Sequence, residues 1–101
     1  MEKNKLLERI RHRLIVSCQA RKGWAMHGPE IMAAFARAAQ EGGASALRLN
    51  GAADIHRVRQ QTELPIIGIN KIWTEDSDVY ITPTFASAEE VLREGIDIIA
   101  L

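Results

Sequence analysis

Residues 65–71, Pro-Ile-Ile-Gly-Ile-Asn-Lys, constrain the fold of this 101-residue chain more than any other segment. The run is short, apolar, rich in β-branched residues and opened by a proline, which is typical of a strand buried on both faces in a parallel sheet. It ends at Lys71, and a lysine beside a buried sheet is costly unless it has a partner or a task there. We therefore hypothesise that Lys71 is the reactive residue.

Strands and helices alternate along the rest of the chain. Strands are predicted over 14–19, 44–50, 65–71 and 96–101. Helices are predicted over 2–13, 52–61, 87–95 and the segment between Gly28-Pro29-Glu30 and Gly42-Gly43. Ser87 and Glu90 match a capping box for the last helix, and residues 72–86 are predicted to be irregular. This order of elements predicts a parallel α/β sheet with right-handed crossovers.

Two architectures share this order, an open doubly wound sheet and a (β/α)8 barrel. The length predicts one domain over residues 1–101. A barrel closes only with eight strands, so four would leave two unpaired edges and one uncovered face. Such edges favour pairing with another chain, and we therefore expect a homo-oligomer.

The composition is that of an ordinary globular domain, with 47% apolar and 26% charged residues. No apolar run approaches the roughly 20 residues of a membrane span, so no membrane partner is expected. The first residues lack the apolar core of a signal peptide. The single cysteine, Cys18, excludes an internal disulfide framework and suits a reducing compartment. These features predict a cytoplasmic protein.

Charge is unevenly distributed. Residues 1–22 hold seven Lys or Arg against two Glu, whereas residues 72–101 hold seven Asp or Glu against Arg93 alone. A basic start suits a nucleic-acid contact, but with aromatics at 5% the chain offers no stacking platform, and a solvated helix face is favoured. The three histidines lack the spacing of metal ligands. We expect no nucleic-acid partner and no metal.

Polar residues stand where three predicted strands end, the edge that carries the active site in parallel α/β folds. Strand alternation aims Gln19, Arg48 and Lys71 into one pocket. An amide, a guanidinium and an amine suit an oxygen-rich, anionic ligand, and the amine becomes a proton acceptor if burial or the guanidinium lowers its pKa. The alternative is that these residues are ordinary solvent-facing strand ends.

Two residues within predicted strands leave alternatives open. Gly68, in mid-strand, indicates either function or close packing, since glycine weakens a strand without such a reason. Asp97, inside the fourth predicted strand, either pairs with a cation at the strand mouth or faces a helix.

Five motifs follow one another in chain order. They are LIVSCQ (14–19), GPEIMAA (28–34), GGA followed by RLNG (42–51), PIIGINK (65–71) and VYITPT (79–84). Together they resemble the N-acylglucosamine-6-phosphate 2-epimerase family, also called N-acetylmannosamine-6-phosphate 2-epimerase. The resemblance runs from about residue 6 to residue 101.

The resemblance implies a (β/α)8 barrel of bacterial sialic acid and amino-sugar degradation. Such an isomerase interconverts N-acetylmannosamine 6-phosphate and N-acetylglucosamine 6-phosphate by removing and replacing the proton at C2, without a redox cofactor. It places the catalytic acid/base on Lys71, and substrate contacts on Gln19 and Arg48.

Members of that family are about twice as long as this chain. Their later strands carry an acidic catalytic partner and the phosphate-binding end. The resemblance therefore implies the N-terminal half of a barrel with impaired turnover. The alternative is a non-catalytic half-barrel that acts by self-association or by pairing with a separate second half.

Overall fold

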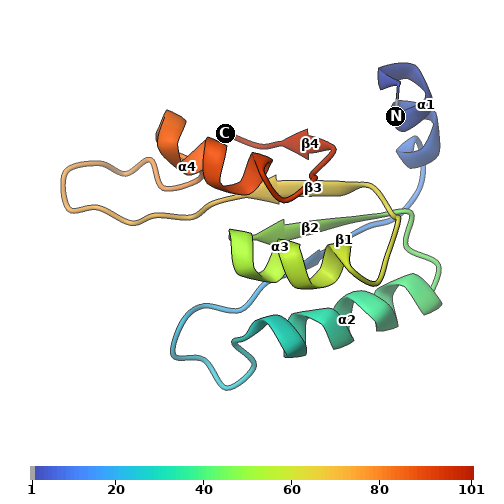
Figure 1. Ribbon diagram of the computed structural model, residues 1–101, viewed down its shortest axis with the longest axis horizontal. Helices are drawn as coiled ribbons and strands as arrows, with labels where there is room; N and C mark the ends of the chain where they lie inside the picture. The colour runs from blue at the N-terminus through green and yellow to red at the C-terminus, as the bar shows by residue number, and fades with distance from the viewer. Residues whose placement is uncertain (1) are drawn as a thin grey trace.

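The computed structural model describes residues 2–101, which form a four-stranded parallel sheet with a helix in each crossover (Figure 1). The helices are α1 (Lys3–Ile10), α2 (Pro29–Glu41), α3 (Ala52–Arg59) and α4 (Phe85–Leu92). The strands are β1 (Ile15–Cys18), β2 (Ala46–Asn50), β3 (Ile66–Ile69) and β4 (Ile98–Ile99). Their order in the sheet is β1-β2-β3-β4. The predicted alternation of parallel strands and crossover helices is confirmed.

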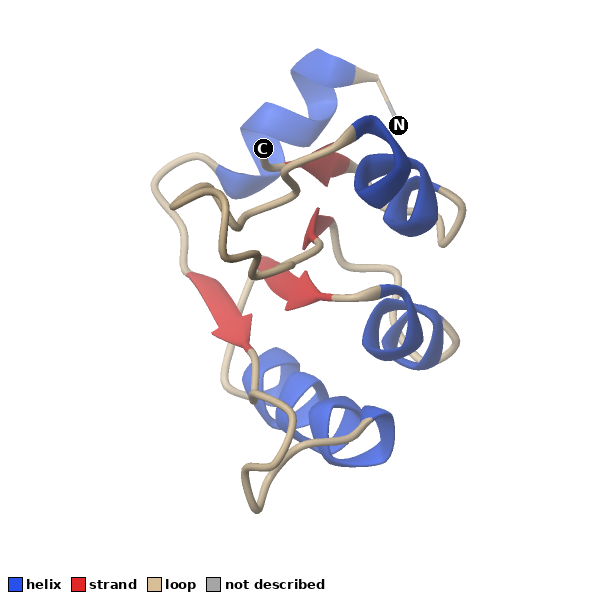
Figure 2. Ribbon diagram, turned by 90° about the vertical axis from the view of Figure 1, so that its left-hand side faces the viewer, coloured by secondary structure: helices blue, strands red, loops and turns tan. Residues whose placement is uncertain are grey.

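The helices α2, α3 and α4 cover one face of the sheet, and none of the three lies on the other face (Figure 2). The core fills the space between the covered face and these helices. Its fully buried large side chains include Met32, Leu47, Leu49, Ile55, Ile66, Val58 and Val91. Successive residues of a strand point to opposite faces of the sheet. The face that α2, α3 and α4 leave uncovered, here called the open face, therefore carries one set of residues that lie side by side on the four strands: Ser17, Arg48, Ile67 and Ile98.

The ends of α2 follow from its sequence as predicted. The helix begins at Pro29, which lacks the N–H that would be unpaired there, and Glu30 complements the helix dipole in the first turn. It ends at Glu41, and Gly43 then takes a φ of +101°, a left-handed conformation that glycine adopts without strain.

The start of α4 differs from the prediction. Thr84, not Ser87, is the N-cap: its hydroxyl accepts from the Ser87 N–H at 3.1 Å, and the Ser87 hydroxyl accepts from the Thr84 N–H at 3.0 Å. The predicted box of Ser87 and Glu90 is therefore wrong. A threonine three residues upstream offers the same reciprocal geometry, and the Glu90 carboxylate instead accepts from Asn70 Nδ2 at 3.1 Å.

The last two strands are shorter than predicted. β3 ends at Ile69, because the next residue bonds a different segment: Asn70 N–H donates to Thr82 Oγ1 at 3.0 Å, and Thr82 N–H donates to the Asn70 carbonyl at 2.9 Å. Residues 71–81 then form an extended loop closed by an antiparallel bridge between Lys71 and Ile81. β4 spans only Ile98–Ile99, so Asp97 precedes that strand rather than lying within it.

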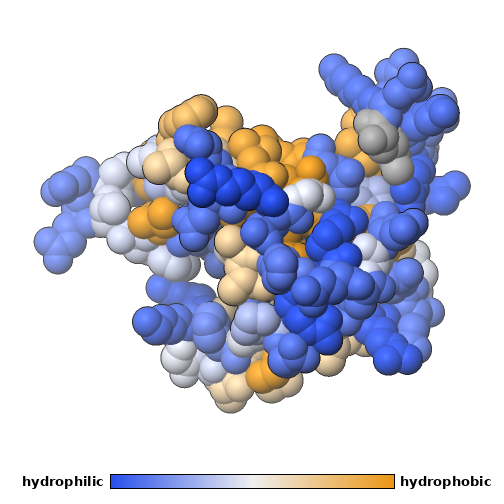
Figure 3. All heavy atoms as spheres, in the orientation of Figure 1, coloured by the Kyte–Doolittle hydropathy of each residue, from blue (hydrophilic) through white to orange (hydrophobic). Residues whose placement is uncertain are grey.

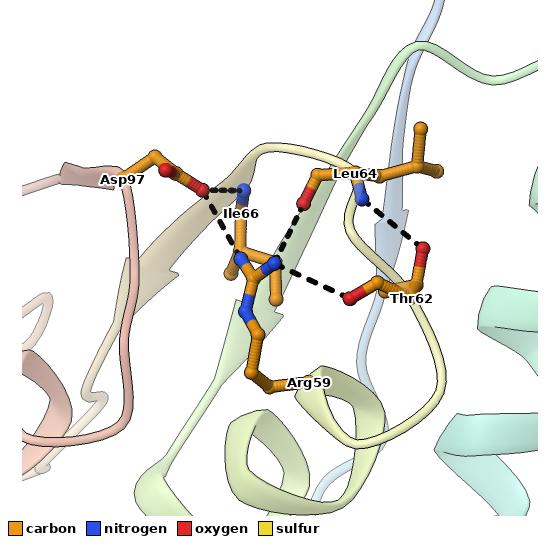
Figure 4. Close-up of polar contacts among 5 residues, drawn as sticks. All are labelled: Arg59, Thr62, Leu64, Ile66 and Asp97. Atoms are coloured by element: carbon orange, nitrogen blue, oxygen red, sulfur yellow. Dashed lines mark hydrogen bonds and ion pairs between the residues drawn. The ribbon is translucent and has the colours of Figure 1, made fainter. Parts of the chain in front are cut away.

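Asp97 joins a cluster at the amino ends of β3 and β4 (Figure 4). Its Oδ2 accepts from the Ile66 N–H at 2.9 Å and lies 3.1 Å from a terminal nitrogen of Arg59. The Arg59 guanidinium also donates to the carbonyls of Leu64, at 3.1 Å, and Thr62, at 3.4 Å. Asp97 thus pairs with a cation from α3, at the opposite end of the strands from the mouth. One charge pair fixes how both strands begin.

We expect Asp97→Asn to lower the free energy of unfolding by about 1–2 kcal/mol, because Arg59 loses a charged partner that is only partly solvated. A matched control is Glu89→Gln, whose partner Arg93 is 74% exposed. Its expected loss is under about 0.5 kcal/mol. Urea unfolding of the two variants measures both effects. Equal losses would show that the cluster contributes no more than a surface pair.

Gly68 is required by close packing. A Cβ placed on it would lie 2.8 Å from both Cγ2 and Cδ1 of Ile96, well inside van der Waals contact. Of the two readings that the sequence left open for this glycine, the structure supports packing against the segment that leads into β4.

Gly68→Ala is expected to destabilise the fold by about 1–3 kcal/mol through overpacking. In an Ile96→Ala background the same change should cost about 1 kcal/mol less, because the clashing atoms are gone. A double-mutant cycle by chemical denaturation measures the coupling. Additive losses would contradict the contact.

Candidate active site

A pocket of about 260 Å³ opens at the carboxyl ends of β1, β2 and β3. It lies at the end of the molecule where the long loops after β1 and β3 extend, to the left in Figure 1. Its lining residues are Gln19, Ala20, Arg21, Lys22, Trp24, His27, Asn50, Lys71 and Trp73. The sheet therefore has a hollow at the edge where the sequence predicts a site.

Lys71 stands two residues beyond β3 and is partly buried. Its backbone N–H donates to Asn50 Oδ1 at 2.8 Å, which ties it to the end of β2. Burial lowers the pKa of the Lys71 amine, and the positive charges of Arg48 and Arg21 lower it further. The amine therefore gives up its proton more readily than an exposed lysine does.

Gln19 follows β1 directly and faces the same pocket. Its Nε2 donates to Ser17 Oγ at 2.7 Å, whereas its buried Oε1 has no hydrogen-bond partner among residues 2–101. A buried acceptor without a donor is costly. Because this oxygen is out of contact with solvent, a hydroxyl or amide N–H of a ligand would satisfy it once the Gln19 side chain turns towards the pocket.

Arg48 does not line this pocket. The register sets it level with Ser17 and Ile67, two residues before the end of β2, and so one layer deeper on the open face. Asn50, level with Ile69, occupies the place at the strand end. The structure thus brings Gln19 and Lys71 into one pocket and leaves Arg48 beneath it, close enough for its charge to lower the pKa of Lys71.

Sequence reasoning missed the aromatic part of the mouth. The guanidinium carbon of Arg21 lies 4.5 Å from the ring centroid of Trp73. Trp73 in turn stacks on Tyr80, with centroids 5.4 Å apart and planes 13° apart. The signal in the sequence is weak: a large aromatic residue within a polar loop. Trp24, 59% exposed in the other loop, carries the same signal.

Two other residues that drew attention in the sequence have defined places. His27 lines the mouth, with Nδ1 3.0 Å from the carbonyl oxygen of Ala20. Cys18 lies in the core, where burial raises the pKa of its thiol. It is a small core residue rather than a nucleophile of this pocket.

Within residues 2–101, no three His, Cys, Asp or Glu side chains come together as a metal site would need. None of the helices described is long and apolar enough to cross a membrane. The charged side chains that line the pocket, Arg21, Lys22 and Lys71, are all cationic. The pocket is thus suited to an anionic, oxygen-rich ligand, with an amine available as a base.

Comparisons with known proteins agree with one another. The family described as "Putative N-acetylmannosamine-6-phosphate epimerase" matches residues 32–101. A protein from Clostridioides difficile (strain 630) named "Putative N-acetylmannosamine-6-phosphate 2-epimerase" is 48% identical over 96 residues, which cover 95% of this chain and 43% of the relative. One from Latilactobacillus sakei is 41% identical over 98 residues, covering 97% of this chain and 42% of the relative.

A solved structure is also similar. It is of the N-acetylmannosamine-6-phosphate 2-epimerase from Clostridium perfringens, and it matches with a TM-score of 0.93 and 40% sequence identity. The match covers all of this chain and 44% of that one. The chain therefore spans less than half the length of the relatives that it matches.

Proposed function

Because this chain belongs to the N-acetylmannosamine-6-phosphate epimerase family, we propose that its pocket binds an amino-sugar 6-phosphate and that Lys71 moves the proton at C2. Membership confirms the family predicted from the five motifs, and the fold is that of part of a (β/α)8 barrel, with three βα units followed by a fourth strand. One observation carries the proposal: a lysine of lowered pKa stands at the mouth of a central strand, in a pocket lined by no carboxylate of residues 2–101.

The proposed step is a proton transfer. In the open-chain sugar, C2 lies next to the C1 aldehyde. The neutral Lys71 amine takes the C2 proton, the C2–H electron pair moves towards the C1 oxygen, and an enolate forms. Cationic side chains near the amine, Arg21 and Arg48, favour the negative charge that develops on that oxygen. Returning a proton to the opposite face of C2 completes the epimerisation.

The second half of the step needs a proton donor on that other face. No carboxylic acid of the described residues lines the pocket, and a complete barrel builds its site from the ends of eight strands. We therefore propose that the chain removes the C2 proton but epimerises more slowly than a relative of full length.

Gln19 and Arg48 are proposed as substrate-binding residues. The unpaired Oε1 of Gln19 supports this role, because it lacks a donor that a sugar hydroxyl or the N–H of the acetamido group would supply once the side chain turns towards the pocket. Arg48, on the layer beneath, offers a guanidinium to sugar oxygens that reach the open face.

We further propose that residues 1–101 act as one domain, the N-terminal half of the barrel. A single sheet and one contiguous core support this. The unpaired, buried thiol of Cys18 suits the reducing cytoplasm, which we propose as the compartment.

Exchange of the C2 proton of N-acetylmannosamine 6-phosphate in D2O, followed by proton NMR, tests the role of Lys71. The chain should accelerate exchange above the buffer rate, and Lys71→Met should remove about 10²-fold or more of that acceleration. Lys5→Met, on the solvated face of α1, is the control and should exchange as the parent does. Parent-like exchange in Lys71→Met, or no acceleration by the parent, would overturn the proposal.

The second candidate function is that of a non-catalytic half-barrel that self-associates. Apolar side chains gather over α4 and β4, at the edge of the sheet (Figure 3). Phe85 is 80% exposed there, and Leu92 is 50% exposed. A second copy of the chain that covers this edge would remove these side chains and the free β4 ladder from water.

Sedimentation equilibrium tests this candidate. The parent should form a dimer as its concentration rises, and Leu92→Glu should weaken the dimer by about tenfold or more. The control is Phe35→Glu on α2, at a similarly exposed apolar position away from β4. A parent that stays monomeric throughout would rule this function out.

A further inference from the structure

Arg21 and Trp73 join two loops that the sequence keeps far apart. Arg21 follows β1 and Trp73 follows β3, yet the guanidinium lies over the indole ring at 4.5 Å. The indole is itself held in place, because it stacks on the ring of Tyr80 in the same loop. A hydrogen bond from Ile72 N–H to the Tyr80 carbonyl closes that loop. That same loop begins at Lys71. The contact therefore anchors one cation relative to the proposed base.

Within residues 2–101, Arg21 is held without a counter-ion. Four other arginines of residues 2–101, Arg37, Arg57, Arg59 and Arg93, pair with carboxylates. Arg21 has no such pair, although the loop that carries Trp73 also carries the acidic residues Glu75, Asp76 and Asp78. An aromatic ring attracts a cation without cancelling its charge, whereas a carboxylate partner would cancel most of it.

We propose that Trp73 holds the Arg21 guanidinium at the pocket as an unneutralised positive charge, which makes Arg21 a positioning residue for the Lys71 amine. A fixed cation beside the amine favours its neutral form and stays available to an anionic oxygen of a ligand. The inference deepens the proposed function, and it rests on that function only for the use to which the neutral amine is put.

Arg21 is one of several groups around Lys71 that lower the pKa of its amine. Arg48 faces it from β2; Arg21, Lys22 and His27 line the pocket from the loop after β1. No Asp or Glu of the described residues lines the pocket. Burial is the first cause of the lowered pKa of Lys71, Arg48 the second and Arg21 the third. Removing Arg21 should therefore weaken the effect without abolishing it.

The test is the pH dependence of acetylation of Lys71 by acetic anhydride, without sugar. Peptide mass spectrometry reads the labelling, with exposed Lys5 as the internal standard. Only the neutral amine reacts, so a higher pKa slows labelling below that pKa. Arg21→Met should slow labelling of Lys71 at pH 8 by about threefold. Arg21→Lys should slow it less, and the remote Arg37→Met should leave it unchanged.

Substitutions of Trp73 test separately whether the Arg21 guanidinium must be held at the pocket and whether its charge must stay unneutralised. Trp73→Phe keeps an aromatic ring, so the rate of Lys71 labelling should stay within about twofold of the parent rate. Trp73→Leu frees Arg21 and should slow labelling as Arg21→Met does. Trp73→Glu holds the guanidinium with a carboxylate, so Lys71 should label more slowly still.

Two results would overturn the inference. One is that Lys71 is labelled as fast in Arg21→Met as in Arg37→Met, and the other is that it is labelled as fast in Trp73→Glu as in Trp73→Phe. Because no sugar is present, failure here is separate from failure of the proposed reaction. If the variants label as expected but the chain catalyses no exchange of the C2 proton, the inference about Arg21 stands and the proposed function does not.

Discussion

Two asparagine side chains hold the backbone as it leaves β3, and the position of Lys71 depends on them. Asn70 is buried, and its Nδ2 donates to the Ser87 carbonyl at 3.0 Å, so the end of β3 is fixed to the first turn of α4. Asn50 accepts from the Lys71 N–H and fixes it to the end of β2. The backbone at Lys71 is therefore tied to two neighbouring elements. A base that must meet one carbon atom, as we propose for Lys71, needs such a rigid support.

The electrostatics of the pocket follow from what surrounds that support. Cations converge on Lys71 from β2 and from the loop after β1, and no carboxylate of residues 2–101 lines the pocket. The carboxylates that are well paired lie elsewhere, such as Asp97 at the amino ends of the strands. One end of the sheet is thus stabilised by a charge pair, whereas the pocket at the other end is lined by cations and by no carboxylate of the described residues. This division matches the separation between stability and function in parallel α/β folds.

Sequence reasoning reached the features that have a local physical cause. The apolar run before Lys71 predicts a buried strand, and Pro29 with Gly43 marks the ends of α2, because such signals depend on near neighbours. The register was harder to predict: nothing local indicates which residue of β2, Arg48 or Asn50, lies level with the ends of β1 and β3. The Arg21–Trp73 contact was beyond reach, because it joins two loops without periodicity whose approach is set only by the finished sheet.

A crystal structure of the chain with N-acetylmannosamine 6-phosphate bound tests most directly whether Lys71 acts on C2 of the sugar. We expect the sugar in the pocket at the carboxyl ends of β1, β2 and β3. Its C2 should lie roughly 3–3.5 Å from Lys71 Nζ, with a hydroxyl or acetamido group donating to Gln19 Oε1. A sugar bound elsewhere, or in this pocket with C2 out of reach of the amine, would contradict that role of Lys71.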